Sequence, residues 1–359
     1  MSVDDSVGVA AFQSALLAWY DAGARVLPWR SPPGAPLADP YRVWLSEIML
    51  QQTTVATVIP YFEAFTTRWP TVVALAGAAD AEVMQAWAGL GYYTRARNLL
   101  ACARVVAGNG FPISEIGLRA LPGVGAYTAA AVASIAFGEA AVVVDGNIER
   151  VMARLFAVET PIPAARPILR VNAAALTPDV RPGDHAQALM DLGATICTPR
   201  SPDCGRCPVR QWCSALATGD PARFPVRAAK VARPVRFGTA YWLEAGGEVL
   251  LVKRPGKGLL GGMLGLPTTD WSDAPTADPP AVADWRVLAE PVRDVFTHFE
   301  LRLLVAAATL PARPEIAGHW VARDAVLAAG LPTLFAHVAR AVLRSTATSA
   351  ERGELDLGE

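Results

Sequence analysis

The sequence predicts a mostly helical region followed by a smaller α+β domain. Apolar residues recur at the i, i+3, i+4 spacing of amphipathic helices from about residue 10 to 214. After about residue 235, short β-rich runs flank a Gly-Gly turn, as in a β-hairpin. At the end of the helical region, four cysteines fall within seventeen residues. The 359-residue length allows two or three domains, and the 52% apolar content allows substantial cores.

The helical period predicts helices over residues 12–20, 41–50, 55–65 and 81–90, separated by proline and glycine. In the second region we expect a hairpin of residues 241–243 and 249–252, a strand over 295–310 and a closing helix over 333–343. A linker is expected over residues 215–234. The polar end of the chain, residues 346–359, is expected to be disordered.

The cysteine cluster has the spacing C-x6-C-x2-C-x5-C, formed by Cys197, Cys204, Cys207 and Cys213. Four thiolates at this density suit either one iron–sulfur cube or one zinc ion. Clustered cysteines of this kind indicate a metal site in a reducing compartment, not a disulfide framework. The fifth cysteine, Cys102, lies in a helical pattern and is expected to be a buried apolar residue.

A glycine hairpin, Leu121-Pro122-Gly123-Val124-Gly125, lies between two helical patterns. Ser114 is the expected N-cap of the first helix, and the second is expected over residues 126–137. The two glycines allow a tight turn and let a nucleic-acid backbone approach closely. Amides at the start of the following helix suit a phosphate oxygen. An ordinary helix–turn–helix connector is the alternative for the bare glycine pattern.

Two carboxylates stand out as candidate catalytic groups. Glu47 lies in an otherwise apolar helical stretch, where desolvation should raise its pKa toward the range of a general acid. Asp145 precedes the helical pattern of residues 148–156, where it would cap the helix and stay ionised. Two carboxyl groups with separated pKa values suit glycosidic bond cleavage. The structural alternatives are a solvated glutamate and a simple N-cap.

Several motifs in order, LPGVGAYTAAAVAS, VDGNIERV and the cysteine spacing, resemble the endonuclease III superfamily of DNA glycosylases. Within it, SEIMLQQTTV and AGLGYYTRARNL resemble the MutY-type adenine DNA glycosylases. The resemblance covers residues 15–214 and, more weakly, the C-terminal domain. It implies a helix–hairpin–helix glycosylase fold over 1–214, with a six-helix part at about 34–140 and an iron–sulfur part at about 1–33 and 141–214. The implied cofactor is a 4Fe–4S cluster.

The resemblance also implies roles for individual residues. Glu47 would protonate adenine, Asp145 would be the catalytic aspartate, and Asn147 and Tyr127 would support them. Endonuclease III-like lyases have a lysine where this chain has Tyr127, so the implied enzyme removes the base without cutting the strand. Extruding a base from the duplex costs a few kcal/mol, which protein contacts must offset. The residues implied to contact DNA or the extruded base are Arg30, Leu50, Gln51, Gln52, Tyr92, Gly123, Val124, Gly125, Gln187, Phe296, Thr297 and His298.

The C-terminal domain, expected over residues 235–345, resembles the Nudix-like lesion-recognition domain of the same family. The resemblance rests on Arg254-Pro255, GLLGGMLGLP and Phe296-Thr297-His298. Thr297 stands where the family usually has serine. A Nudix hydrolase needs clustered glutamates for metal ions, and residues 256–290 contain no Glu pair. We therefore expect lesion recognition and no pyrophosphate hydrolysis.

The implied function is removal of adenine opposite 8-oxoguanine or guanine in double-stranded DNA. The net charge of −1 gives no support for nucleic-acid binding, although the basic residues are nearly all arginine, which forms forked phosphate contacts. With no apparent membrane span or signal peptide, we expect a cytoplasmic monomer. The alternatives are a bifunctional pyrimidine glycosylase and abasic lyase, and a non-catalytic iron–sulfur protein that binds DNA or transfers electrons.

Overall fold

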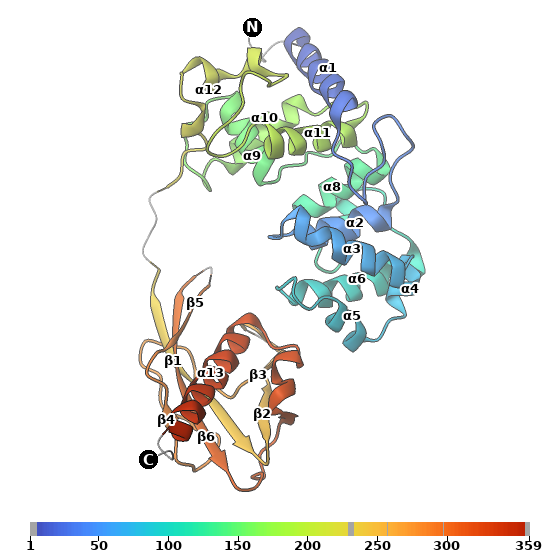
Figure 1. Cartoon of the computed structure of the whole chain (residues 1–359). Helices are drawn as coiled ribbons and strands as arrows, with labels where there is room; N and C mark the ends of the chain where they lie inside the picture. The colour runs from blue at the N-terminus through green and yellow to red at the C-terminus, as the bar shows by residue number, and fades with distance from the viewer. Residues whose placement is uncertain (1–5, 229–232, 257, 297, 356–359) are drawn as a thin grey trace. The chain divides into compact units, whose positions relative to one another are not determined.

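The computed structural model describes residues 6–228, 233–256, 258–296 and 298–355. The chain divides into two compact units, Met1–Ala229 and Lys230–Glu359. The first unit is helical (Figure 1). Its α-helices are α1 Ser6–Gly23, α2 Pro40–Leu50, α3 Val55–Arg68, α4 Val72–Ala76, α5 Asp80–Ala86, α6 Thr94–Asn109, α7 Glu115–Arg119, α8 Ala126–Phe137, α9 Gly146–Leu155, α10 Arg166–Leu176, α11 Pro182–Thr195 and α12 Ser214–Ala217.

The helices predicted over 12–20, 41–50 and 55–65 are confirmed as parts of α1, α2 and α3. The helix predicted over 81–90 was wrong at its end, because α5 stops at Ala86. Gly89 and Gly91 adopt positive φ angles, and the Trp87 indole donates a hydrogen bond to the Gly91 carbonyl. This loop geometry is incompatible with a continued helix. The expected burial of Cys102 is confirmed.

Helix α8 lies at the centre of the first unit, in contact with α2, α7 and α11 (Figure 1). Its small residues let neighbouring helices approach closely. A Cβ atom on Gly183 of α11 would lie 2.6 Å from the Ser134 carbonyl oxygen of α8. Likewise, a Cβ on Gly193 would lie 2.6 Å from Cβ of Asn147. Glycine at these two positions therefore brings α11 against α8 and the start of α9.

The first part of the predicted linker is packed into the helical unit. It contains α12 and the 3₁₀ turn Pro221–Arg223, and Phe224 is fully buried. The Arg154 guanidinium donates to the Phe224 carbonyl, and the amide of Ile162 donates to the Val226 carbonyl. The prediction of a linker starting at 215 therefore missed the burial of an aromatic side chain and its backbone pairing.

The second unit contains a seven-stranded sheet of order β3-β2-β1-β6-β4, with β5 paired to β6 and β7 to β2. Its strands are β1 Val235–Ala245, β2 Glu248–Lys253, β3 Leu264–Gly265, β4 Arg286–Val287, β5 Val292–Val295, β6 Glu300–Leu310 and β7 His319–Ala322. Strands β1 and β6 pair in parallel over their whole length, and α13 (Thr333–Leu355) packs on the sheet. The predicted hairpin is confirmed as the antiparallel pair β1–β2.

Two predictions for this unit need correction. Residues 295–310 do not form one strand, because β5 ends at Val295 and β6 begins at Glu300 and pairs antiparallel with β5. The predicted disorder of the polar end was wrong for residues 346–355, where α13 continues to Leu355. Alanine, arginine and glutamate in this stretch are good helix formers, so polarity did not imply disorder.

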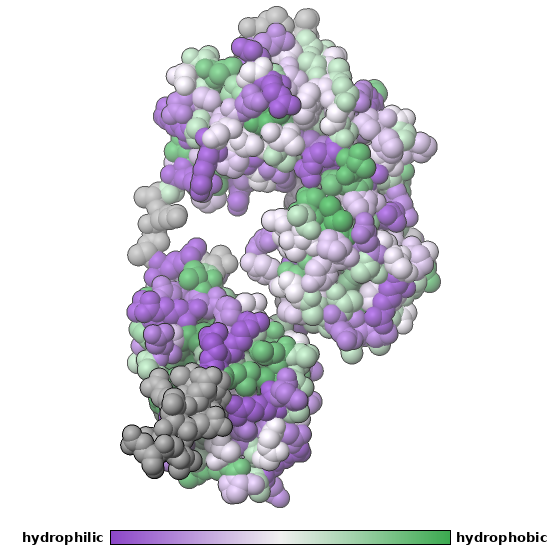
Figure 2. All heavy atoms as spheres, viewed as in Figure 1, coloured by the Kyte–Doolittle hydropathy of each residue, from purple (hydrophilic) through white to green (hydrophobic). Residues whose placement is uncertain are grey.

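In each unit, hydrophilic residues cover much of the visible face, and smaller hydrophobic areas are interspersed among these residues (Figure 2). None of the helices in the described part of the chain combines the length and hydropathy of a membrane span.

Candidate active site

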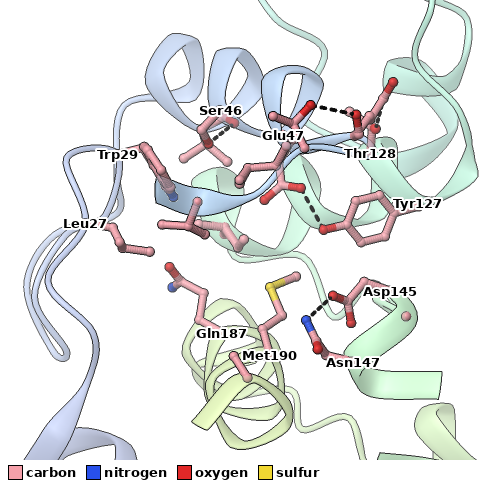
Figure 3. A pocket seen from close by; sticks show the side chains of 18 of the residues that line it. Leu27, Trp29, Ser46, Glu47, Tyr127, Thr128, Asp145, Asn147, Gln187 and Met190 are labelled. Carbon is pink, nitrogen blue, oxygen red and sulfur yellow. Dashed lines mark hydrogen bonds between the residues drawn. The ribbon is translucent and has the colours of Figure 1, made fainter. Parts of the chain in front are cut away.

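A cavity of about 1050 Å³ opens between α2, the start of α8, the start of α9 and α11 in the first unit. Its wall combines carboxylates, amides, a phenol and apolar side chains (Figure 3). Of the sequence-predicted site residues of this unit, it brings together Arg30, Glu47, Leu50, Gln51, Gln52, Gly123, Gly125, Tyr127, Asp145, Asn147 and Gln187. Segments more than a hundred residues apart thus meet in one place.

Glu47 is the buried carboxyl group of this cavity. It lies on α2 and is 5% exposed. The Tyr127 hydroxyl, from the first turn of α8, donates a hydrogen bond of 2.7 Å to Glu47 Oε2 (Figure 3). Burial raises the pKa of Glu47 to about 7, while the hydrogen bond from Tyr127 lowers it and the charge of Asp145 raises it. Glu47 therefore exchanges a proton in the neutral range, as a general acid must.

Asp145 lies across the cavity at the start of α9 and is partly exposed to it (Figure 3). Its Oδ1 accepts the Ile148 amide at 2.7 Å, so it caps the helix. Its Oδ2 accepts a hydrogen bond of 2.9 Å from the Asn147 side chain. Burial raises the pKa of Asp145, and these hydrogen bonds oppose the rise. From the sequence we expected the helix start to keep Asp145 ionised. In the structure, burial raises the pKa of Asp145 by more than the capping hydrogen bonds lower it.

Arg30 and Gln187 line the cavity from the loop before α2 and from α11. The Arg30 guanidinium is held by Asp191 at 2.7 Å, with both side chains almost fully buried. Gln187 is 5% exposed, and its amide faces the cavity (Figure 3). Asp191 was not predicted from the sequence, because an aspartate in an amphipathic helix gives no sign of burial against an arginine 161 residues away.

The predicted hairpin has the expected geometry. Ser114 caps α7, accepting the Gly117 amide, and α8 begins at Ala126, so both boundaries are confirmed. Gly123 has a φ of +73°, and a Cβ there would lie 2.5 Å from Cβ of Asn98. Gly123 and Gly125 are exposed, whereas the Val124 side chain is buried. A ligand can therefore approach the glycine backbone, while the valine side chain packs in the core.

Gln51 and Gln52 follow the last residue of α2, as predicted. Gln51 donates to the Thr128 hydroxyl, and Gln52 is exposed with a φ of 59°. Tyr92 is also exposed, with a φ of 48°. These two left-handed residues both line a second cavity, of about 220 Å³, that shares Gln51, Gln52 and Gly123 with the first. Such backbone angles are uncommon outside glycine.

All four clustered cysteines line one small cavity between α9 and the loop after α11. Arg154 is fully buried and donates to the sulfur of Cys197 at 3.2 Å and to the carbonyls of Thr198 and Pro199. A buried guanidinium compensates thiolate charge, so the donor set fits a 4Fe–4S cluster. Among the described residues, no three or more His, Cys, Asp or Glu side chains converge for a single metal ion. A four-iron cube spreads its ligands more widely than one ion does.

Arg150 and Arg154 are further residues that the sequence analysis missed. Arg150 donates to the Asn147 side chain and to the carbonyls of Gly193 and Cys197. Both arginines lie on α9, four residues apart, on the side that meets the cysteine loop. The only sequence signal was the presence of arginine in an otherwise apolar helical face, which is also typical of solvated positions.

In the second unit, Phe296 is half-buried and stacks on Trp271 with 6.0 Å between ring centroids. His298 is exposed, and Thr297 lies outside the described residues. The roles of these three residues stay predictions.

The comparisons with known proteins agree with this arrangement. Residues 45–169 match the HhH-GPD superfamily of base excision DNA repair proteins. Residues 197–213 match the iron–sulfur binding domain of endonuclease III, and residues 238–341 match the NUDIX domain. The helical unit thus matches the base excision DNA repair proteins, and the predicted 4Fe–4S cofactor is confirmed, whereas the four cysteines as its ligands stay a prediction.

The chain is 44% identical to the adenine DNA glycosylase of Mycolicibacterium smegmatis, over 62% of this chain and 76% of the relative. It is 39% identical to the human adenine DNA glycosylase, over 74% of this chain and 59% of the relative. The chain belongs to the adenine DNA glycosylase family. It spans about half the length of the mammalian and plant relatives it matches.

Solved structures agree on the fold. A thermostable thymine-DNA glycosylase is 30% identical, with a TM-score of 0.53 over 60% of this chain and 100% of its own. A non-covalent complex of endonuclease III with DNA has a TM-score of 0.50 at 21% identity, over 60% of this chain and 98% of its own.

Proposed function

We propose that this protein removes adenine mispaired with 8-oxoguanine or guanine in duplex DNA, by hydrolysis of the N-glycosidic bond. The observation that carries the proposal is the placement of Glu47, hydrogen-bonded to Tyr127, and Asp145 in one large cavity. Family membership supports adenine as the base. A cavity of about 1050 Å³ has room for an extruded purine nucleotide.

In the proposed reaction, protonated Glu47 donates its proton to a ring nitrogen of adenine. The bond between the sugar C1′ and the base breaks, and the electron pair leaves with the base. The ionised carboxylate of Asp145 stabilises the resulting oxocarbenium ion, or bonds to it transiently. Water then adds its hydroxide to C1′ and returns a proton to Glu47. The cluster supplies no step; the four cysteines that hold it order the loop after α11.

The other cavity residues have supporting roles in this proposal. Gln187 presents its amide to the edge of the extruded adenine, and Arg30, held by Asp191, borders the same pocket. Gln52 and Tyr92 enter the duplex and compensate for the cost of extruding the base. The exposed backbone of Gly123 and Gly125 approaches the DNA backbone, and the amides at the start of α8 donate to a phosphate oxygen.

The proposed enzyme is monofunctional. Tyr127 occupies the position where a lyase would have its lysine, and a phenol forms no Schiff base. The sequence has lysine only at 230, 253 and 257, so residues 1–229 contain no lysine at all. A lysine-based strand-cutting step is therefore not available from the helical unit.

In the second unit, we assign recognition of the opposing 8-oxoguanine to Phe296, Thr297 and His298. Its NUDIX match does not extend to hydrolysis in this proposal, because residues 256–290 lack a pair of glutamates. The protein would act as a monomer, in the compartment that holds the genome.

The test is a single-turnover assay of the cluster-loaded protein on duplexes containing A:8-oxoG, A:G or A:T. We expect adenine release from the first two, no release from A:T, and strand breaks only after alkali. Borohydride should trap no protein–DNA adduct. Prompt nicking with a trapped adduct would favour the lyase, and binding without base release would favour a non-catalytic protein.

A further inference from the structure

One arginine, Arg95, lines the second cavity, and its guanidinium bonds both the end of α2 and the loop before α6. Arg95 lies in the first turn of α6. Its Nη1 donates to the carbonyls of Ile48, Met49 and Gln51, and its Nη2 donates to the Thr53 hydroxyl. The last carbonyls of a helix have no intrahelical partner, so these contacts satisfy the end of α2.

The same guanidinium also contacts the loop that carries Tyr92. Nη2 donates to the carbonyls of Leu90 and Gly91, at 3.1 and 3.4 Å. The guanidinium carbon lies 5.4 Å from the ring centroid of Tyr92 and 5.4 Å from that of Trp87. Trp87 in turn donates to the Gly91 carbonyl. One forked side chain therefore bridges two segments about forty residues apart in the sequence.

These two segments include the two exposed left-handed residues, Gln52 and Tyr92. A residue in this region of φ is held there by its surroundings at a cost on the order of 1–3 kcal/mol. Two of the carbonyls that accept hydrogen bonds from Arg95, those of Gln51 and Gly91, belong to the residues directly before Gln52 and Tyr92. These hydrogen bonds restrain the peptide planes that lead into Gln52 and Tyr92, and the left-handed φ of each residue then sets the direction of its side chain.

We propose that Arg95 is a positioning residue that presents Gln52 and Tyr92 together as one wedge for opening the duplex. This inference rests on the proposed function and deepens it. The guanidinium itself does not touch the base or the sugar. A lysine at this position would keep the charge, but its single ammonium lacks the planar fork that reaches both segments at once.

Arg104 is a matched control on the same helix. Its guanidinium also donates to backbone carbonyls, those of Ala76 and Ala78, and to Asp80. These partners lie at α4 and α5, and Arg104 lines neither the first nor the second cavity. Replacement of Arg104 also removes guanidinium bonds to backbone carbonyls from the same helix, although fewer of them, and leaves Gln52 and Tyr92 alone.

The experiment compares the parent protein, R95M, R95K and R104M, all cluster-loaded. A duplex with 2-aminopurine in place of the target adenine reports base extrusion by fluorescence, and single-turnover excision from A:8-oxoG is measured over a range of pH. We expect both R95 variants to lose the fluorescence rise and about 100-fold in excision rate, the scale of effect of a misplacement of about 1 Å. The pH midpoint of excision should not move, and R104M should match the parent.

Normal base extrusion in a folded R95K would overturn the inference, as would an equal loss in R104M. A shift of the pH midpoint would also overturn it, because Arg95 would then act through Glu47. If neither R95 variant folds, Arg95 is a folding residue and the positioning role is rejected. Absence of adenine excision by the parent protein would instead refute the proposed function, which separates the two failures.

Discussion

The Tyr127 hydroxyl donates a 2.7 Å hydrogen bond to Oε2 of Glu47, inside the cavity that Asp145 closes from the other side (Figure 3). This pair joins the first turn of α8 to the middle of α2. The phenol stabilises the ionised form of Glu47, against the desolvation that raises its pKa to about 7. In the proposed enzyme, the position at which a lyase would have its lysine thus also adjusts the proposed acid.

Replacement of Tyr127 by phenylalanine should raise the pKa of Glu47 further, because it removes a hydrogen bond to the carboxylate. Excision requires protonated Glu47, so the rate falls as pH rises through this pKa. We expect the alkaline midpoint of the single-turnover pH–rate profile to move up by about one pH unit, the equivalent of one hydrogen bond. An unchanged or lower midpoint in Y127F would contradict the role of the hydrogen bond. Y41F, which removes a buried hydroxyl bonded to Trp69, is the control.

Glu47 should also destabilise the protein at high pH. Its folded pKa, about 7, lies above its ordinary value of 4.5, so the folded state binds the proton more tightly. Stability from this group is present below pH 4.5 and is lost as pH rises to 7. E47Q should therefore exceed the parent in unfolding free energy at pH 8, by up to about 3 kcal/mol, and lose this advantage near pH 4.5. Chemical denaturation of both proteins at the two pH values measures this difference in unfolding free energy. An equal advantage of E47Q at both pH values would exclude linkage to the proton of Glu47.

Replacement of Asp145 by asparagine keeps the helix cap and removes the charge. Excision should fall by at least about 100-fold, the lower end of what one electrostatic group contributes to catalysis. The matched control is D39N, because Asp39 caps α2 by accepting the Tyr41 amide but lies outside the cavity. We expect D39N to excise adenine at the parent rate. Equal losses in the two variants would mean that Asp145 acts only as a cap.

The hairpin glycines should respond differently to alanine. Gly123 has a positive φ, and a Cβ there would meet Asn98 at 2.5 Å, whereas Gly125 has a φ of −84° with nothing within 4 Å. G123A should lower the free energy of unfolding by about 1–3 kcal/mol. G125A should unfold like the parent and lose only affinity for duplex DNA. A fully stable G123A would show that the turn adapts, contrary to this account.

Arg154 should protect the cluster. R154M removes the buried guanidinium beside Cys197 and frees the carbonyls of Thr198 and Pro199. We expect the cluster absorbance near 400 nm to bleach in air about tenfold faster or more, on the scale of other outer-sphere ligand effects. R166M, which breaks an exposed pair with Glu149, is the control. Equal bleaching rates in R154M and the parent would contradict the role of Arg154.

Sequence reasoning reached the helical region, the glycine hairpin and the cysteine site because each has a local pattern. The cap at Ser114 and the start of α8 at Ala126 follow from residue types at fixed spacings. What the sequence missed depends on long-range packing. Phe224 is buried where α9 presents Arg154 to its carbonyl, and Asp191 is buried in contact with Arg30 and Arg25, which lie more than 160 residues away in the sequence. In the sequence, Arg95 looks like any helix-surface arginine, because the carbonyls that it bonds come from segments that only the fold brings together.

The most direct test of the account is adenine release from an A:8-oxoG duplex by the parent protein and by E47Q, in single turnover near neutral pH. Both proteins must show the same cluster absorbance and bind the duplex equally. The account predicts rapid release by the parent and none by E47Q, since the amide cannot protonate the leaving base. Retained excision by E47Q would contradict the proposed mechanism.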